Sequence, residues 1–299
     1  MRSLSLHHYP QIIFKDQEKF LWNPILKKAF KNLPEERVRL QLVEYLTQEA
    51  AFSKNRLSFE TPVNLPRDKA ASRTDLICYD SDFKPTVLIE CKAPEIKLDG
   101  KAAIQISRYN QLVGASTLMI SNGVHDYWFS AKGNELLQKV PEQFKSKKEP
   151  ARNYEYWSER GFAGKNSDFE IQPWISESCI ELYLNNESRS LFFNFEGTSS
   201  ELFLSNFYRI FHVDEQTNIA LALTSTPYGA TKLNAVLNYN GENIALLSVS
   251  LDLLATEEPQ NSILQNHKGF QHFDIVVETG LNFGQSLGSL VPEFAELMG

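Results

Sequence analysis

Two short apolar segments separated by a polar turn place the strongest constraint on the fold of this chain. The segments Thr74–Tyr79 and Thr86–Cys91 are rich in branched and apolar residues, and residues 80–85 between them read Asp-Ser-Asp-Phe-Lys-Pro. Segments of this length and composition favour β-strands, and a turn of this composition favours a hairpin loop. We therefore predict that the two segments are consecutive strands of one sheet.

The neighbouring segments predict alternating helices and strands. A helix is expected from Pro34, because apolar residues recur there at three- and four-residue spacing and acidic residues occupy the first turn. A further strand is predicted over 57–63, a second helix over 100–113, and two more strands over 117–121 and 125–129. The order helix, three strands, helix, two strands predicts an α/β domain with a mixed sheet.

The pattern changes after residue 175, where strands prevail. Helical segments are expected near 201–211 and 291–298, and strands over 179–184, 191–195, 218–223, 235–239, 244–251 and 273–277. We predict a first domain over residues 1–140, a linker or peripheral segment over 141–175, and a second, β-rich domain over 176–299 whose fold and role the sequence does not name.

Charge is distributed unevenly along the chain. The formal net charge is −7, but residues 1–165 hold 26 Lys and Arg against 20 Asp and Glu, whereas residues 166–299 hold 4 against 17. The first part thus carries +6 and the second −13. A basic first part attracts phosphates and an acidic second part is repelled by them. The alternative is that two solvated surfaces differ by chance.

Composition indicates a globular protein of the cytoplasm. With 299 residues and 42% hydrophobic residues, the chain can bury the core of one large domain or two ordinary ones. No segment approaches the roughly 20 apolar residues that span a membrane, and the first ten residues have no signal-peptide pattern. The three cysteines lack CxxC spacing, which fits reduced thiols rather than a zinc finger. We expect no membrane contact.

Charged residues interrupt the apolar segments at two places. Asp75 precedes Leu76-Ile77-Cys78, and Glu90-Cys91-Lys92 follows Val87-Leu88-Ile89. Glu90 and Lys92 point together, because residues two apart in a strand share a face. If the two strands pair, Asp75 reaches the same point, and two carboxylates there form an oxygen-rich site for Mg²⁺.

In the hydrolysis of a phosphodiester, Lys92 would position or deprotonate the attacking water, since the pKa of a lysine falls on burial or near cations. Taken alone, an acid at a strand end is usually solvated, and a Glu-x-Lys triplet is usually part of a cross-strand ion pair. The combination of Asp75, Glu90 and Lys92 favours phosphodiester hydrolysis.

Four motifs carry a resemblance to a known family. The motifs are Pro34-Glu35-Glu36-Arg37-Val38-Arg39, Arg73-Thr74-Asp75-Leu76, Leu88-Ile89-Glu90-Cys91-Lys92-Ala93-Pro94 and Gln105-Ile106-Ser107-Arg108-Tyr109-Asn110. In this order they resemble the N-terminal nuclease domain of the R subunits of type I restriction enzymes, and of shorter standalone proteins similar to it, over about residues 30–130.

That domain belongs to the PD-(D/E)xK nuclease group. The resemblance implies a restriction-endonuclease-like mixed sheet flanked by helices, and a Mg²⁺-dependent endonuclease acting on DNA, with Mn²⁺ as an alternative ion. It implies that Asp75 and Glu90 hold the metal and that Lys92 is catalytic. Gln105 and Tyr109 match the Gln-x-x-x-Tyr motif of this branch, whose residues support the active site and contact DNA.

The sequence departs from the family pattern in two places. Thr74 stands where the group often has proline. A helical glutamate often completes the metal site, and here both Glu36 and Glu44 are candidates; we favour Glu36, because it lies in the matching segment. The chain also lacks a Gly-x-x-x-x-Gly-Lys-Ser/Thr loop, so an ATP-driven translocase is not expected within it.

Basic residues around the proposed site are candidate phosphate contacts, although each is about as readily a plain solvated charge. They are Arg37, Arg39, Arg73, Lys97, Lys101 and Arg108. The expected partners are DNA and other restriction or defence subunits, and no oligomeric state is predicted.

Two alternative functions stay open. One is a non-catalytic DNA-binding or assembly module gated by the acidic C-terminal half, and the other is an interaction protein that uses a nuclease fold as scaffold.

Overall fold

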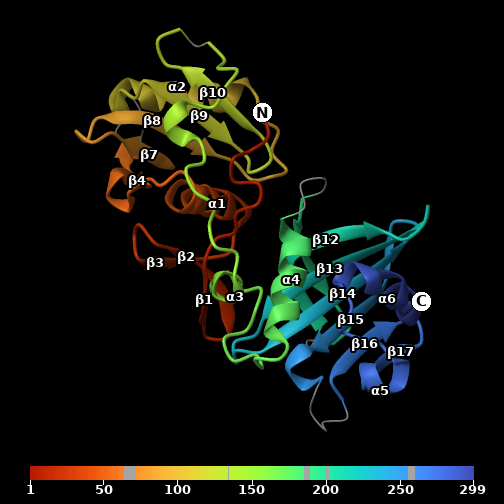
Figure 1. Cartoon of the computed structure of the whole chain (residues 1–299). Coiled ribbons are helices and arrows are strands. Elements are labelled where there is room, and N and C mark those ends of the chain that lie inside the picture. Colours follow the sequence, from red (N-terminus) through yellow and green to blue (C-terminus); the bar gives the residue numbers. More distant parts are fainter. Residues whose placement is uncertain (64–71, 134, 185–188, 200–201, 255–259) are drawn as a thin grey trace. The chain divides into compact units, whose positions relative to one another are not determined.

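A computed structural model describes the chain except for residues 64–71, 134, 185–188, 200–201 and 255–259 (Figure 1). The chain folds into two compact units, Met1–Pro150 and Ala151–Gly299. The second unit begins within the segment predicted as a linker, and helix α3 (Tyr154–Glu159) there buries Tyr156 and Trp157. Among the described residues, no helix has both the length and the apolar character needed to span a membrane.

A five-stranded sheet forms the centre of the first unit, with the strand order β10-β9-β8-β7-β4. Strands β8 and β9 run parallel and the other neighbours run antiparallel, so the predicted mixed sheet is confirmed. The strands are β4 (Leu57–Phe59), β7 (Leu76–Tyr79), β8 (Pro85–Cys91), β9 (Thr117–Ser121) and β10 (Asp126–Ser130).

Helices α1 (Pro34–Gln48) and α2 (Gly100–Val113) flank this sheet (Figure 1). Ile89 of β8 belongs to the apolar cluster that contains the buried face of α1. Its neighbour Leu88 packs instead with Ile106 of α2. Because successive strand residues point to opposite faces, the two helices cover opposite sides of the sheet.

Local signals set the ends of these elements. Pro34 is the first residue of α1, where its missing N–H costs no hydrogen bond. Asp99 caps α2 by accepting a hydrogen bond from the Lys101 N–H, and Gly114 ends it in the left-handed region at φ 72°. The side chain of Asp80 accepts hydrogen bonds from two backbone N–H groups of the β7–β8 turn, which confirms the predicted hairpin.

Two small sheets in the first unit were not predicted, although residues 62–63 of one of them belong to the strand predicted over 57–63, which the structure divides into two. Between β1 and β2, Asp16 and Gln17 both have positive φ, at 51° and 67°, as a two-residue hairpin of this handedness requires. The sequence Asp-Gln lacks the glycine that usually signals such a turn. The strands are β1 (Ile12–Lys15), β2 (Glu18–Asn23) and β3 (Lys28–Phe30) in one sheet, and β5 (Pro62–Val63) and β6 (Ser72–Arg73) in the other.

The second unit contains a seven-stranded antiparallel sheet whose strands follow one another in chain order. Its β-rich character is therefore confirmed. Helix α4 (Gln172–Tyr183) packs on β12 and β13, and α6 (Val291–Met298) packs on β14 and β15. The strands are β11 (Leu191–Glu196), β12 (Phe203–His212), β13 (Thr217–Ser225), β14 (Thr231–Tyr239), β15 (Glu242–Ser250), β16 (Ser262–Asn266) and β17 (Gly269–Phe273).

Three predictions for this unit were wrong. Residues 179–184 lie at the end of α4 rather than in a strand: Cys179 and Leu182 are buried while Ile180 is 44% exposed, which is a helical period. The helix predicted over 201–211 is wrong, because residues 203–211 belong to strand β12; residue 201 lies outside the described residues. The strand predicted over 273–277 stops at Phe273, because Asp274 caps the short helix α5 (Ile275–Thr279).

Asp126, the first residue of β10, is a fully buried acid in the first unit. Its carboxylate accepts a hydrogen bond of 2.7 Å from the backbone N–H of Leu4. Burial nevertheless dominates, and it raises the pKa of Asp126 from 3.8 to about 6. The ionised form is thus disfavoured in the folded protein.

We expect Asp126→Asn to gain stability relative to wild type as the pH rises. The folded-state pKa lies above the unfolded value, so the stability that protonated Asp126 contributes at low pH is lost as the pH rises through about 6. Asparagine has no such loss. Urea unfolding at pH 4 and pH 7 should show the difference between the two proteins moving by up to ~3 kcal/mol in favour of the variant. A difference that is the same at both pH values, as expected for Asp82→Asn in the exposed turn, would contradict this account.

Candidate active site

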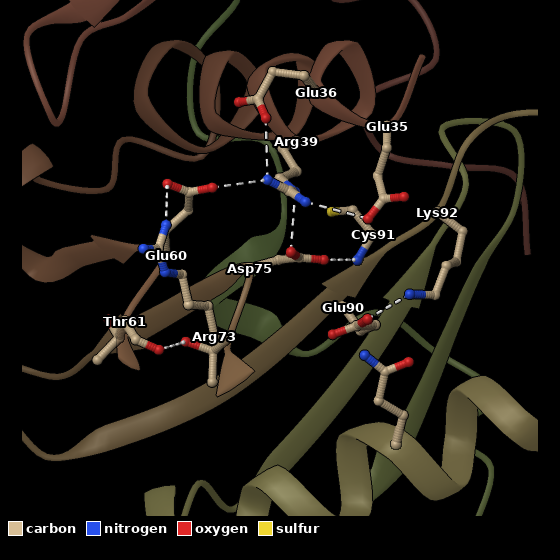
Figure 2. Close-up of polar contacts among 12 residues, drawn as sticks. Glu35, Glu36, Arg39, Glu60, Thr61, Arg73, Asp75, Glu90, Cys91 and Lys92 are labelled. Carbon is tan, nitrogen blue, oxygen red and sulfur yellow. Dashed lines mark hydrogen bonds and ion pairs between the residues drawn. The ribbon is translucent and has the colours of Figure 1, made fainter. Parts of the chain in front are cut away.

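Asp75 and Glu90 lie opposite each other at one end of the β7–β8 ladder (Figure 2). Leu76 pairs with Ile89, so the next residues outward are Asp75 and Glu90, whose side chains share a face of the sheet. The backbone N–H of Cys91 donates to Asp75 Oδ2 at 2.6 Å, which fixes the carboxylate at the strand end. The exposed fractions are only 6% for Asp75 and 3% for Glu90.

Lys92 extends along the same face and forms an ion pair with Glu90. Its Nζ lies 2.5 Å from Glu90 Oε1, and its side chain is 20% exposed. Burial alone would lower the pKa of Lys92, but the hydrogen bond and charge of Glu90 outweigh burial and raise it above 10.5. The predicted fall in this pKa is therefore wrong. A protonated Lys92 can neutralise negative charge or donate a hydrogen bond.

Arg39 of α1 is surrounded by four carboxylates (Figure 2). Its Nε lies 2.9 Å from Asp75 Oδ1, and its Nη2 lies 3.2 Å from Glu35 Oε1. Its Nη1 lies 3.0 Å from Glu36 Oε2 and 3.4 Å from Glu60 Oε1. The planar guanidinium can reach several acids at once, which the point charge of a lysine could not do.

The sequence did not predict this role of Arg39. The three- and four-residue spacing of Glu36 and Glu35 from Arg39 in one helix is a signal that could have indicated two of the ion pairs. Glu60 carries no such signal. It approaches because the turn after β4, with Glu60 itself at φ 50°, brings it beside the start of β7.

Burial of these acids raises their pKa values. Desolvation is the largest cause for Glu36, Asp75 and Glu90. The pKa values of Glu36 and Glu90 are raised from 4.5 to about 7, and the pKa of Asp75 is raised from 3.8 to about 6. The charge of Asp75 further raises the pKa of Glu90, while that of Arg39 lowers the pKa of Asp75. The protein therefore holds like charges together at an energetic cost, which a cation would relieve.

The acid cluster comprises Glu35, Glu36, Glu60, Asp75 and Glu90, and the cations paired with it are Arg39, Arg73 and Lys92. When all five acids are ionised, the three cations leave two negative charges, which one divalent ion would cancel.

The side chains at this site supply oxygen ligands of the kind that Mg²⁺ prefers, but too few of them to complete its coordination. Within the described ranges, no group of three His, Cys, Asp or Glu side chains has the geometry to hold a metal. Asp75 and Glu90 offer two hard oxygen ligands, and Mg²⁺ commonly takes its other positions from water and phosphate. Buried Glu36 is a further candidate, because its Oε1 has no hydrogen-bond partner. The negative charge of Glu35 raises the pKa values of Asp75, Glu90 and Lys92 alike.

Gln105 and Tyr109 lie one turn apart on α2, the helix that covers the Leu88 face of the sheet. The side-chain amide of Gln105 donates to the Tyr109 hydroxyl at 3.3 Å, so the two residues share one side of the helix. Both side chains are partly exposed. Their predicted contact with DNA remains a prediction.

The six candidate phosphate contacts fall into two groups. Arg37 is buried and donates to the backbone and side-chain oxygens of Asn32, and Arg39 is held by the acid cluster. Neither guanidinium is directed at open solvent. The exposed members are Arg73, Lys97, Lys101 and Arg108.

Residues 34–142 match the family model described as the type I restriction enzyme R protein N terminus. The match covers α1, the five strands of the mixed sheet and α2, and so includes every candidate site residue. This part of the chain is thus similar to a domain of restriction enzymes. No curated protein matches the chain.

We expect Glu90→Gln to stabilise the metal-free protein. The substitution removes one of two buried like charges while keeping the shape of the side chain, and the raised pKa of Glu90 implies a gain of about 1–3 kcal/mol at pH 8. Urea unfolding with a chelator present measures it. The exposed Glu142, substituted by Gln, is the control and should change stability by less than ~0.5 kcal/mol. A Glu90→Gln protein no more stable than wild type would show that these charges are not in conflict.

Proposed function

We propose that the first unit is a Mg²⁺-dependent endonuclease of the PD-(D/E)xK group that hydrolyses DNA phosphodiester bonds. The observation that carries the proposal is the position of Asp75 and Glu90, two buried carboxylates facing each other across paired strands with Lys92 beside them. The match of residues 34–142 to the R-protein N terminus supports the same reading.

Asp75 and Glu90 would hold the Mg²⁺ ion, with Mn²⁺ as a substitute, and Glu36 is the further candidate ligand. When bound, the ion supplies Lewis-acid stabilisation of the phosphate and lowers the pKa of a bound water. Its two positive charges also match the two negative charges left over by the acid cluster. The metal would therefore be favoured by electrostatics as well as by ligand type.

Lys92 acts through its positive charge. Because its pKa is raised, the ammonium is present at neutral pH, where it can stabilise the negative charge that builds up on the phosphate oxygens. In the reaction, a water oxygen bonds to phosphorus and gives up a proton to solvent, the bond from phosphorus to the leaving sugar oxygen breaks, and that oxygen takes up a proton from solvent, so that one water is consumed. Gln105 and Tyr109, joined by their hydrogen bond, would orient the water or the backbone from α2.

Exposed basic side chains would bring the DNA backbone to this site. Arg73, Lys97, Lys101 and Arg108 are the members of the predicted set that reach solvent. The first unit carries 23 Lys and Arg against 18 Asp and Glu, whereas the second carries 7 against 19. DNA would thus bind to the first unit, and the acidic second unit is suited to a protein partner, such as another subunit of a restriction or defence system.

The same charge division supports a second candidate function, a DNA-binding or assembly module whose nuclease site is silent and gated by the acidic second unit. Both candidates bind DNA, but only the first breaks the phosphodiester bond. Strand cleavage therefore separates them.

Incubation with supercoiled plasmid and Mg²⁺ or Mn²⁺ is the direct assay. We expect wild type to nick the plasmid, and Lys92→Ala to lower the rate by about 100-fold or more, because it removes the positive charge beside Glu90 that would stabilise the charge on the phosphate. Lys84→Ala, in the exposed β7–β8 turn, is the matched control and should cleave at the wild-type rate.

Nicking at an equal rate by the Lys92→Ala protein would overturn the nuclease proposal. Plasmid binding in a gel-shift assay without nicking under either ion would support the silent module instead.

A further inference from the structure

The guanidinium of Arg39 places a positive charge directly beside Asp75, one of the two acids of the proposed metal site. In two-metal sites of nucleases a second ion supplies such a charge, about 3.5–4 Å from the first. Here the carboxylate of Asp75 already has a cation on one oxygen, because Arg39 Nε lies 2.9 Å from Oδ1. Its other oxygen, Oδ2, accepts the Cys91 N–H and faces the Glu90 side.

The surroundings of Arg39 resemble those of a bound ion more than those of a surface arginine. Carboxylates from four residues surround it, and its side chain is only 16% exposed. Three of them, Glu36, Glu60 and Asp75, come from separate segments of the chain. A cation in such surroundings sets the distances between acids that would otherwise repel one another.

We infer that Arg39 is a positioning residue that replaces a second divalent ion, so that the site binds a single metal at Asp75 and Glu90. This inference rests on the proposed function. Arg39 holds Asp75 in place and forms ion pairs with Glu35, Glu36 and Glu60, which leaves the Glu90 side of Asp75 to accept a metal. Glu36 then serves mainly to hold Arg39, through its Oε2.

Removal of this charge should create a second ion site. In Arg39→Gln the guanidinium is absent, and Asp75 Oδ1, Glu36 Oε2 and Glu60 Oε1 lose a shared cation, while Glu36 Oε1 already has no partner. These are hard oxygen ligands from three segments, which suit Mn²⁺. Arg39→Lys keeps one positive charge at the same place and should keep the single-ion site.

Calorimetric titration of the whole chain with Mn²⁺ tests the inference. We expect one ion per chain for wild type, for Arg39→Lys and for the control Arg56→Gln, whose side chain lies over the ring of Phe52 away from the acid cluster. We expect two ions for Arg39→Gln. In thermal unfolding, Arg39→Gln should melt below wild type with a chelator present and should gain more from saturating Mn²⁺ than wild type does.

The outcomes separate the inference from the proposed function. Two ions bound by wild type, or one ion bound by a folded Arg39→Gln protein, would overturn the inference while leaving a metal-dependent nuclease in place. No ion bound by wild type would remove the proposed function itself. If Arg39→Gln melts lower by the same amount with and without Mn²⁺, the arginine has a purely structural role.

Discussion

The antiparallel pairing of β7 with β8 is the constraint on which the rest of the site depends. Leu76 opposite Ile89 places Asp75 opposite Glu90, and apolar residues on both faces of these strands lock the register. A slip of one residue would turn Leu88 and Ile89 to the wrong faces, which the two helices on either side of the sheet would not tolerate. The hydrophobic core thus fixes the separation of the two carboxylates without any contact from a ligand.

Holding these acids together has an energetic cost that points towards function. Burial raises the pKa values of Glu36, Asp75 and Glu90, and only partial compensation comes from Arg39 and Lys92. Buried charges of one sign are rarely kept for stability alone, because apolar residues of similar volume would serve at least as well. Clusters of perturbed carboxylates are instead typical of metal and catalytic sites.

The sequence predicted those parts of the fold that local signals determine. Pro34 allowed the start of the first helix to be predicted, and the Asp80–Pro85 turn allowed the hairpin to be predicted. The apolar segments predicted the central strands. The β1–β2 hairpin was missed because its turn is Asp-Gln rather than a glycine pair, and residues 179–184 were assigned to a strand because their branched and aromatic residues hide a helical period.

The site shows the same division between local and long-range determinants. The pairing of Glu90 with Lys92 follows from spacing in one strand, and that of Gln105 with Tyr109 from one helical turn. The position of Arg39 could not be predicted in full, because Glu60 and Asp75 approach it only when the sheet is assembled. The raised pKa of Lys92 likewise depends on a 2.5 Å contact that no sequence rule supplies.

A crystal grown with Mn²⁺ and measured near the manganese absorption edge tests the central claim most directly. The account predicts one anomalous peak between the carboxylates of Asp75 and Glu90, and a peak elsewhere, or none at saturating Mn²⁺, would contradict it.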